Sequence, residues 1–165
     1  EARATNVSAT TNMDRGDIEA GFAEADAIIE RTYRVPVVHQ GYLEPHASIA
    51  AVDPTGRVTV WTMTQGMWRV MDETTETLGL ASHQLKVVPM PVGGGFGGKT
   101  VLLEPLAAAL AMTQRRPVQV LMTRMDEFAA TTPSPAAIIR VKLGGKKDGS
   151  LTALDSEVEI GRAHV

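Results

Sequence analysis

The sequence predicts a fold of the α/β class in the broad sense, with an α+β arrangement in which helices flank a mixed sheet. The 165 residues are 44% hydrophobic and 21% charged, a composition typical of a folded domain rather than a disordered chain. Segments with strand-like alternation and segments with helical spacing follow one another along the chain. Glycine and proline clusters separate these segments at short intervals, as turns do in compact domains.

The first predicted elements are a short helix and a strand. Asp17 stands where an N-cap is expected, and acidic residues fill the turn that follows it, so residues 18–25 are predicted to form a helix. Residues 27–35 alternate between apolar and polar side chains and are predicted to form a strand.

A hairpin and a longer helix are predicted next. Residues 48–52 and 57–62 flank Asp53-Pro54-Thr55-Gly56, which has proline second and glycine fourth, as a β-turn favours. These two segments are therefore expected to pair. Residues 67–80 carry apolar side chains at helical spacing, and Gly79 is a natural end for that helix.

A glycine tract separates the next strand from the next helix. Residues 85–90 are predicted to form a strand, and the tract occupies residues 93–98. An alanine-rich helix is expected over residues 102–114, with Pro105 in its first turn. Residues 117–123 are predicted to form a buried strand.

The last predicted elements are a short helix over residues 125–130 and a hairpin. Asp148-Gly149 is a strong turn signal between strands at residues 138–143 and 150–158. Several methionines are interpreted as side chains that fill the core. They are Met63, Met67, Met71, Met122 and Met125.

Charge and cysteine content exclude several classes of function. The 16 basic and 19 acidic residues are interspersed and give a net charge of -3, so no nucleic-acid groove or membrane surface is expected. No apolar run has the length of a membrane span. The chain has no cysteine, which excludes disulfides, thiolate metal ligands and a cysteine nucleophile within it.

The segment Gly93–Thr100 fits the phosphate-loop pattern of glycine, any four residues, glycine, lysine and threonine. Alone, this pattern predicts a nucleotide-binding module or NTPase. However, few elements follow it to complete a parallel sheet, and the only acid-ended apolar run downstream, residues 151–155, is interrupted by threonine. Five glycines around one aromatic indicate instead a backbone pressed against a large ligand. A flexible turn without a ligand is the remaining interpretation.

Other polar clusters have ordinary structural interpretations. His39, Glu44 and His46 could be zinc ligands, but their spacing fits no standard site, and a hydrogen-bonded, partly buried loop is the simpler reading. Gln65 lies at a strand-to-helix junction, where it is more often a neighbour of the N-cap than a ligand contact.

A short helix begins with Arg124, Asp126 and Glu127. Acidic side chains near a helix N-terminus stabilise the helix, and this role is enough to explain them. The chain also shows no convincing set of serine, histidine and aspartate for nucleophilic catalysis.

Three segments, taken in order and spacing, resemble the molybdopterin-binding subunit of the xanthine dehydrogenase and aldehyde oxidase family. They are Tyr42-Leu43-Glu44-Pro45, Thr64-Gln65 and Gly93 to Lys99. The likeness extends to Arg15-Gly16-Asp17, Arg116-Pro117-Val118, Thr123-Arg124 and the hairpin at Asp148-Gly149. We interpret residues 1–159 as a partial molybdopterin-cofactor-binding domain and residues 160–165 as a non-native read-through tail.

The resemblance implies that the protein is a molybdenum-dependent oxidoreductase that hydroxylates an aldehyde or N-heterocycle with oxygen from water. Gln65 would hydrogen-bond the metal's apical oxo group, and Phe96 would lie at the metal and the substrate channel. Neither side chain would be a direct metal ligand. The backbone at Gly94, Gly95 and Gly97 would approach the cofactor, and Lys99 would brace the tract.

The resemblance also implies what the chain lacks. Members that hydroxylate purines carry a glutamate directly after this lysine, whereas this chain has Thr100, which favours an aldehyde or another small substrate. The family's catalytic glutamate and its substrate-side arginine match no residue here, so the chain contributes no catalytic residue and is expected to be inactive alone.

Cofactors and partners follow from the same resemblance. The cofactor would be molybdenum bound to molybdopterin, as such or as its cytosine dinucleotide. Iron–sulfur clusters and FAD would reside on partner subunits of one complex. We expect a cytoplasmic protein, with the periplasm as the open alternative.

Overall fold

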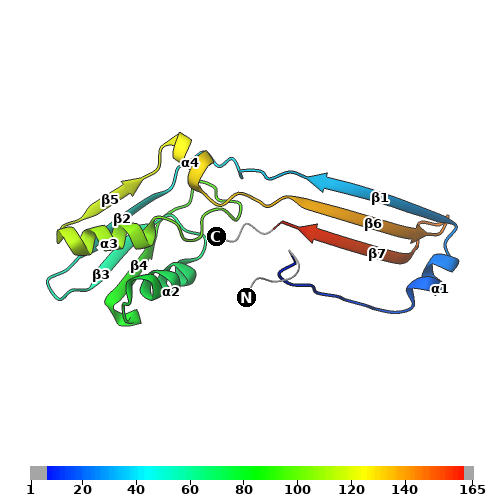
Figure 1. Ribbon diagram of the computed structural model, residues 1–165, viewed down its shortest axis with the longest axis horizontal. Coiled ribbons are helices and arrows are strands. Elements are labelled where there is room, and N and C mark those ends of the chain that lie inside the picture. Colours follow the sequence, from blue (N-terminus) through cyan, green and yellow to red (C-terminus); the bar gives the residue numbers. More distant parts are fainter. Residues whose placement is uncertain (1–6, 162–165) are drawn as a thin grey trace. The chain divides into compact units, whose positions relative to one another are not determined.

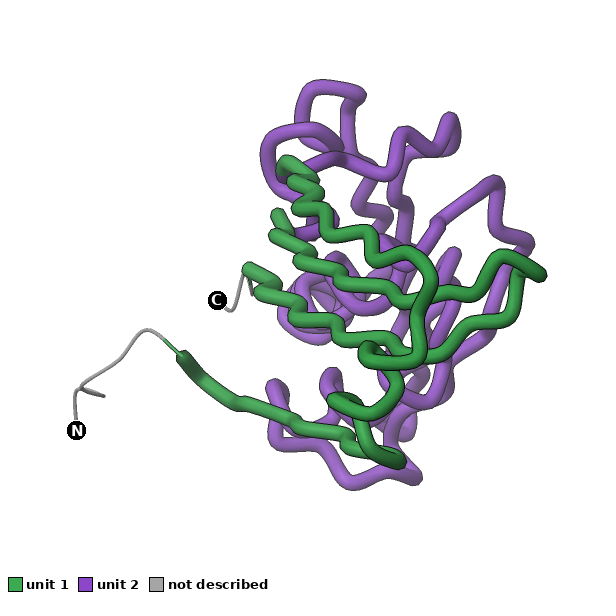
Figure 2. Tube along the Cα trace, turned by 90° about the vertical axis from the view of Figure 1, so that its right-hand side faces the viewer, with its two compact units in different colours: residues 1–36, 136–162 green, residues 37–135, 163–165 purple. Residues whose placement is uncertain are grey.

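The computed structural model describes residues 7–161 and confirms the mixed α/β class (Figure 1). These residues divide into two compact units, and Figure 2 shows that unit 1 is built from both ends of the chain. Unit 1 comprises residues 7–36 and 136–161, and unit 2 comprises residues 37–135. No shift in composition marks this division. It depends on pairing between strands far apart in the sequence, which local sequence patterns do not reveal.

Unit 1 is a three-stranded antiparallel sheet of order β1-β6-β7 with one short helix. Its elements are α1 Ile18–Ala23, β1 Ala27–Val35, β6 Ala137–Gly145 and β7 Leu151–Ile160. The predicted N-cap is confirmed, since Asp17 Oδ1 accepts a hydrogen bond from the Ala20 N–H at 3.0 Å. The helix contacts β7 through Gly21, where a Cβ would lie 2.5 Å from the Thr152 carbonyl oxygen.

One face of the unit 1 sheet exposes large apolar side chains. Alternate residues of a strand share a face, and the register aligns Ile29 with Leu143 and Leu143 with Leu154. Six side chains of this face on β1 and β7 are between 44% and 63% exposed. They are Ile29, Tyr33, Val35, Leu154, Val158 and Ile160. An exposed apolar patch of this kind is typical of a contact surface.

The segment interpreted as a non-native tail is only partly described. Ile160 is the last residue of β7, and the Gly161 N–H donates to the Ala136 carbonyl at 2.7 Å. Residues 162–165, including His164, lie outside the described residues. The non-native origin of residues 160–165 stays a proposal, which the sequence of the source gene would test.

Unit 2 is a four-stranded mixed sheet of order β4-β3-β2-β5 with helices. Its strands are β2 Ala47–Val52, β3 Val58–Thr62, β4 Leu85–Pro89 and β5 Val118–Leu121. Its helices are α2 Met67–Leu78, α3 Glu104–Gln114, α4 Arg124–Ala130 and the 3₁₀ turn η1 Ser82–Gln84. Strands β3 and β4 are parallel because α2 crosses between them, and the other pairs are antiparallel.

Local signals placed these elements correctly. The predicted hairpin is confirmed, with Asp53 Oδ1 accepting hydrogen bonds from the Thr55 N–H at 2.8 Å and the Arg57 N–H at 3.0 Å. Helix α2 ends as predicted at Gly79, whose φ of 64° places it in the left-handed region that glycine adopts without strain. Pro105 lies in the first turn of α3.

The core of unit 2 lies between the sheet and α3. Three alanines of α3, Ala107, Ala108 and Ala111, are fully buried against the sheet. They pack with valine, alanine and leucine side chains of the strands, including Ala50 and Val60. Alanine at these positions lets the helix backbone approach the strands closely, because a larger side chain would hold the two layers apart.

Two expectations about burial are wrong. Residues 117–123 were expected to form a buried strand, but β5 is an edge strand with alternating exposure, and Leu121 is 62% exposed. Met125 was expected in the core and is 75% exposed on α4. Both errors have the same cause: apolar residues in a short segment do not reveal which other elements will cover them.

The sheet face opposite the buried face carries an apolar groove of about 670 Å³. It is lined mainly by side chains of β2 and β3 and of the segments that follow β4 and precede β5. They include Ile49, Trp61, Met63, Met90, Pro91 and Pro117. No helix that the structure describes combines the length and apolar character needed to cross a membrane.

The close contact of α3 predicts the effect of a larger core residue. Ala108→Leu should lower the free energy of unfolding by about 1 to 3 kcal/mol, because the extra volume has no space. Urea unfolding followed by tryptophan fluorescence would measure this, since Trp61 and Trp68 both lie in unit 2. Met112→Leu, at an exposed position of the same helix, is the control and should change little. Equal stability of the two variants would contradict this packing.

Candidate functional site

The glycine tract of residues 93–98 forms a loop between β4 and α3, with backbone conformations that its residue types explain in part. Gly94 and Gly97 have φ values of 91° and 89°, which glycine adopts without strain. Phe96 also has a positive φ, 48°, which is uncommon for a residue with a side chain. Such a conformation persists only when surrounding contacts hold it, and it is often found at functional sites.

Three other glycines of the tract are needed because protein side chains approach them. A Cβ on Gly93 would lie 2.8 Å from the Glu44 Cβ, and one on Gly98 would lie 3.0 Å from the Gln40 Cδ. A Cβ on Gly95 would overlap the amide of Gln65. All five glycines were expected to lie against a ligand, but these three accommodate side chains of the same unit. Among the five glycines of the tract, only Gly97 combines a positive φ with open space around its Cβ position.

Gln65 is held against the tract by three hydrogen bonds. Its Oε1 accepts from the Gly97 N–H at 3.1 Å and from the Lys99 N–H at 3.2 Å. The backbone N–H of Gln65 donates to the Lys99 carbonyl at 2.8 Å. Two donors on Oε1 fix which end of the amide is oxygen. The Nε2 donor has no partner within residues 7–161, so the side chain presents an oriented N–H group.

Gln65 therefore does more than lie beside an N-cap. Helix α2 has Gly66 as its N-cap with no side-chain cap, and the Gly66 N–H donates to Thr64 Oγ1 at 3.0 Å. The same Thr64 hydroxyl donates to the Thr100 carbonyl at 2.8 Å. Thr64 and Gln65 thus join the start of α2 to the far end of the glycine tract.

The phosphate-loop interpretation finds no support in this geometry. The Lys99 side chain is fully buried, and its Nζ is paired with Glu44 rather than facing an open cradle. The N–H groups of Gly93, Gly97 and Lys99 already donate to protein side chains. The following helix begins at Glu104 and not directly after the loop, so its N-terminus does not complete a phosphate cradle.

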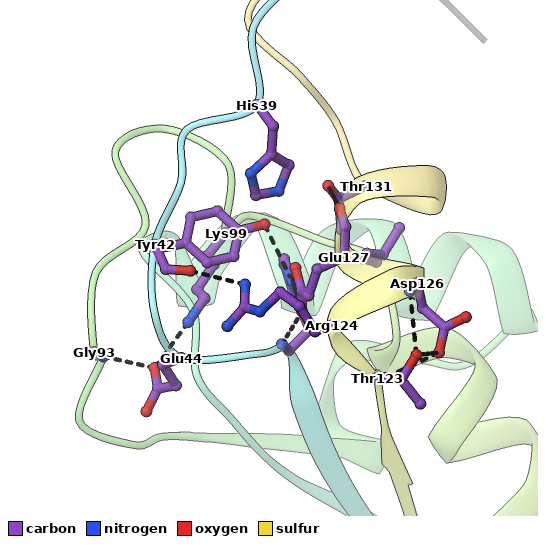
Figure 3. Close-up of polar contacts among 12 residues, drawn as sticks. His39, Tyr42, Glu44, Gly93, Lys99, Thr123, Arg124, Asp126, Glu127 and Thr131 are labelled. Carbon is purple, nitrogen blue, oxygen red and sulfur yellow. Dashed lines mark hydrogen bonds and ion pairs between the residues drawn. The ribbon is translucent and has the colours of Figure 1, made fainter.

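Lys99 and Glu44 form an ion pair that braces the tract, as Figure 3 shows. Glu44 Oε2 lies 2.8 Å from Lys99 Nζ and accepts the Gly93 N–H at 2.6 Å. Lys99 Nζ also lies 4.8 Å from the centre of the Tyr42 ring. Burial acts to raise the pKa of Glu44, but the hydrogen bonds from Lys99 and Gly93 outweigh it and hold that pKa below its ordinary value.

A second buried cluster joins the segment around His46 to α4. Glu127 is fully buried, and its carboxylate accepts hydrogen bonds from the His46 backbone N–H and from His46 Nδ1, the latter at 3.0 Å. Burial acts to raise the pKa of Glu127, but hydrogen bonds from His46 and Tyr42 outweigh it, so the pKa is lowered. Burial raises the pKa of Tyr42, which lies between this cluster and Lys99.

These contacts show what the candidate zinc ligands do instead. His46 is buried and bonded to Glu127, and Glu44 is bonded to Lys99. His39 Nδ1 accepts the Gly41 N–H at 3.0 Å, and its ring lies 4.9 Å from that of Tyr42. The hydrogen-bonded, partly buried loop is therefore what the structure contains. No group of three potential metal-ligating side chains occurs among the described residues.

Sequence reasoning missed the roles of Arg124 and Glu127. Both were assigned only to the start of a helix, a role that Asp126 does fill by accepting the Thr123 N–H at 2.9 Å. Arg124 instead donates to the backbone carbonyls of Tyr42, at 3.0 Å, and Leu43. The available signal was an acidic residue within the helix, but nothing local indicates that it is buried.

The two candidates for substrate contact differ in exposure. Phe96 is 73% exposed at the tip of the tract, whereas Thr100 is partly buried and its carbonyl accepts the Thr64 hydroxyl. The N–H groups of Gly94, Gly95 and Phe96 donate to no acceptor within the described residues. The apolar groove of unit 2 is lined by none of these residues. The tip of the tract thus combines unpaired N–H groups with one exposed aromatic ring, although Gly95 itself is buried.

The lowered pKa values of Glu44 and Glu127 predict acid sensitivity. A carboxylate with a depressed pKa stabilises the fold above its unfolded pKa of about 4.5, and this contribution is lost as the pH falls through the lower folded value. The free energy of unfolding of unit 2 should therefore decrease as the pH drops below about 4.5. Glu127→Gln should be less stable at neutral pH and should show a smaller acid loss.

Urea unfolding at pH values on both sides of 4.5 would measure these effects. Glu76→Gln removes an exposed carboxylate of α2 and should keep the full acid dependence. An acid dependence of Glu127→Gln equal to that of the parent would show that Glu127 is not the titrating group.

Comparison with known proteins gives one consistent assignment. The pattern that defines the molybdopterin cofactor-binding domain matches residues 1–161. The chain is 39% identical over 150 residues to the probable hypoxanthine oxidase XdhD of Escherichia coli K12, covering 90% of this chain and 16% of that protein. It is 32% identical over 150 residues to the aldehyde oxidoreductase molybdenum-binding subunit PaoC of the same strain, covering 90% and 20%.

A solved structure supports the same assignment. The aldehyde oxidoreductase from Desulfovibrio gigas superposes with a TM-score of 0.80 at 28% identity, covering 88% of this chain and 16% of that one. The chain thus spans between 16% and 20% of the length of these proteins. The earlier resemblance is confirmed: the chain belongs to the molybdopterin cofactor-binding domain family of the xanthine dehydrogenase and aldehyde oxidase type.

Proposed function

We propose that this chain helps to hold the molybdenum cofactor of a hydroxylase that oxidises an aldehyde or N-heterocycle with oxygen from water. The observation that carries the proposal is the oriented amide of Gln65 beside unpaired N–H groups at the tip of the tract. Family membership supports the cofactor class, and the similarity to a probable hypoxanthine oxidase and an aldehyde oxidoreductase subunit supports the reaction class.

The residues at the tip fit a group that carries oxo and other anionic oxygen atoms. Gln65 Nε2 and the N–H groups of Gly94, Gly95 and Phe96 are all donors, and none is used within residues 7–161. Donors without competing acceptors suit an oxygen-rich anion. A neutral amide also adds no charge near the metal, so it can orient an oxo group without a large electrostatic change.

The bound cofactor would supply two-electron redox chemistry at molybdenum, and the residues of this chain would orient it and limit its surroundings. Gln65 would donate to an oxygen of the metal centre. Phe96, held at a positive φ and 73% exposed, would form an apolar wall beside the reacting position. Gly97, with open space at its Cβ position, would allow the cofactor to approach the backbone.

Thr100 supports a preference within the substrate class. A threonine at this position offers a short neutral hydroxyl in place of the glutamate that the resemblance associates with purine substrates. A site that pairs its polar groups with a ligand discriminates strongly against ligands that leave them unpaired. We therefore propose a small aldehyde, or a heterocycle that needs no carboxylate partner here, as the substrate.

We further propose that the remaining functions of the enzyme are supplied outside this chain. No residue here is assigned as the catalytic base, so the chain alone should be inactive. This chain contains no cysteine, so the ligands of an iron–sulfur cluster would lie outside it. We place the iron–sulfur clusters and FAD on partner subunits. The cofactor would be molybdopterin or its cytosine dinucleotide.

Metal content tests the proposal. The longest reading frame that includes this chain would be expressed with molybdenum-cofactor maturation factors, and molybdenum would be measured by mass spectrometry. We expect about one metal per protein chain. No molybdenum, together with tight binding of magnesium-ATP, would overturn the proposal in favour of the nucleotide-binding alternative.

Substitution of Gln65 should lower cofactor retention. Gln65→Glu replaces the donor Nε2 with an acceptor and adds negative charge, so we expect about 10- to 100-fold weaker retention, as for residues that support a metal site from outside its ligands. The readout is molybdenum content after dialysis. Gln114→Glu, at the exposed end of α3, is the matched control and should retain the metal. Equal retention by the two variants would remove Gln65 from the site.

A further inference from the structure

We infer that α4 positions the cofactor-side glycine tract through the segment of residues 38–46, with Glu127 and Arg124 as the positioning residues. This inference rests on the proposed function, because it assigns how the proposed site is held. Among the described residues, no hydrogen bond or ion pair joins Arg124 or Glu127 to the tract. They act through Glu44, which lies in that segment and binds the tract (Figure 3).

The segment of residues 38–46 is tied to residues 122–134 along its length. Val38 and Ser134 form an isolated β-bridge, and Gln40 Nε2 donates to the Thr132 carbonyl at 3.0 Å. At the other end, the Met122 N–H donates to the His46 carbonyl at 2.9 Å. The segment has no regular secondary structure of its own, apart from this bridge, so these contacts determine its conformation.

Glu127 and Arg124 act on either side of Glu44. Arg124 donates to the carbonyls of Tyr42 and Leu43, directly before Glu44. Glu127 accepts from the His46 backbone and ring, two residues after it. The Glu44 backbone is therefore held from both directions by one helical turn of α4. A buried carboxylate with several donors is a strong anchor, because its loss leaves those donors buried and unpaired.

Glu44 transmits this position to the tract. Its Oε2 binds Lys99 Nζ at 2.8 Å and the Gly93 N–H at 2.6 Å, at the two ends of the tract. The Lys99 backbone in turn makes two hydrogen bonds with Gln65. A displacement of residues 42–46 would therefore move both ends of the tract and the amide proposed to face the cofactor.

Helix α4 is itself fixed by its own cap. Thr123 Oγ1 accepts the Asp126 N–H at 3.2 Å, and Asp126 Oδ2 accepts the Thr123 N–H at 2.9 Å. Asp126 and Glu127 are adjacent acids with different partners, because Asp126 stabilises the helix and Glu127 binds the neighbouring segment. Substituting these two residues one at a time therefore distinguishes the stability of α4 from its effect on the neighbouring segment.

The test compares Glu127→Gln with Asp126→Asn in the full-length protein that carries this chain. Hydrogen exchange at the bonded N–H groups of Gly93, Gly97 and Lys99 in the cofactor-free protein is the first readout. We expect exchange about tenfold faster in Glu127→Gln, because the tract opens more readily when its brace is loose. Asp126→Asn should change exchange in α4 and leave the tract close to the parent.

Retention of molybdenum is the second readout. We expect about tenfold weaker retention in Glu127→Gln, although Glu127 does not touch the cofactor site. The double variant Glu127→Gln/Glu44→Gln should retain as much molybdenum as Glu44→Gln alone, because Glu127 is inferred to act on the tract through the Glu44 carboxylate. Additive losses would show that Glu127 does not act through Glu44 and would overturn the inference.

The outcomes separate this inference from the proposed function. If the parent protein binds no molybdenum, the proposed function fails, and the exchange of residues 93–99 still decides the role of α4. If Glu127→Gln does not fold, Arg124→Gln removes the donors to Tyr42 and Leu43 and takes its place. Unchanged exchange of the tract in a folded variant would overturn the inference.

Discussion

The ion pair between Lys99 and Glu44 is the interaction on which the candidate site depends. A fully buried ammonium group requires a partner, because leaving water is costly for an isolated charge. Glu44 supplies that partner and at the same time accepts the Gly93 N–H, so one carboxylate closes the glycine tract at both ends. The same loop contains the positive φ of Phe96, and its Gly97 and Lys99 N–H groups hold the amide of Gln65.

Local structure was largely predictable from the sequence because its causes are local. Asp17 caps α1, the turn at Asp53 forms the hairpin, and Gly79 ends α2, each through contacts within a few residues. The division into two units was not predictable, because β1 pairs with β6 more than one hundred residues later. The exposure of Met125 was not predictable for the same reason, since it depends on which distant segments cover α4.

The site shows the same limit in its chemistry. Motif order singled out Gln65 and the glycine tract as candidates, but it did not give the reason for each glycine. Gly93, Gly95 and Gly98 face Glu44, Gln65 and Gln40, all of which are distant in the sequence. Glu127 was missed because its partner, His46, lies 81 residues away. A charged residue in a short helix looks solvent-exposed until the fold shows what covers it.

The central claim is that the tip of the glycine tract and Gln65 face the molybdenum cofactor. A crystal structure of the cofactor-loaded full-length protein tests it most directly, through the distance from Gln65 Nε2 to the nearest oxygen on the metal. The account predicts a hydrogen bond, at roughly 2.7 to 3.2 Å, with Phe96 beside the metal. A cofactor bound elsewhere, with Gln65 Nε2 in contact only with solvent or protein, would contradict it.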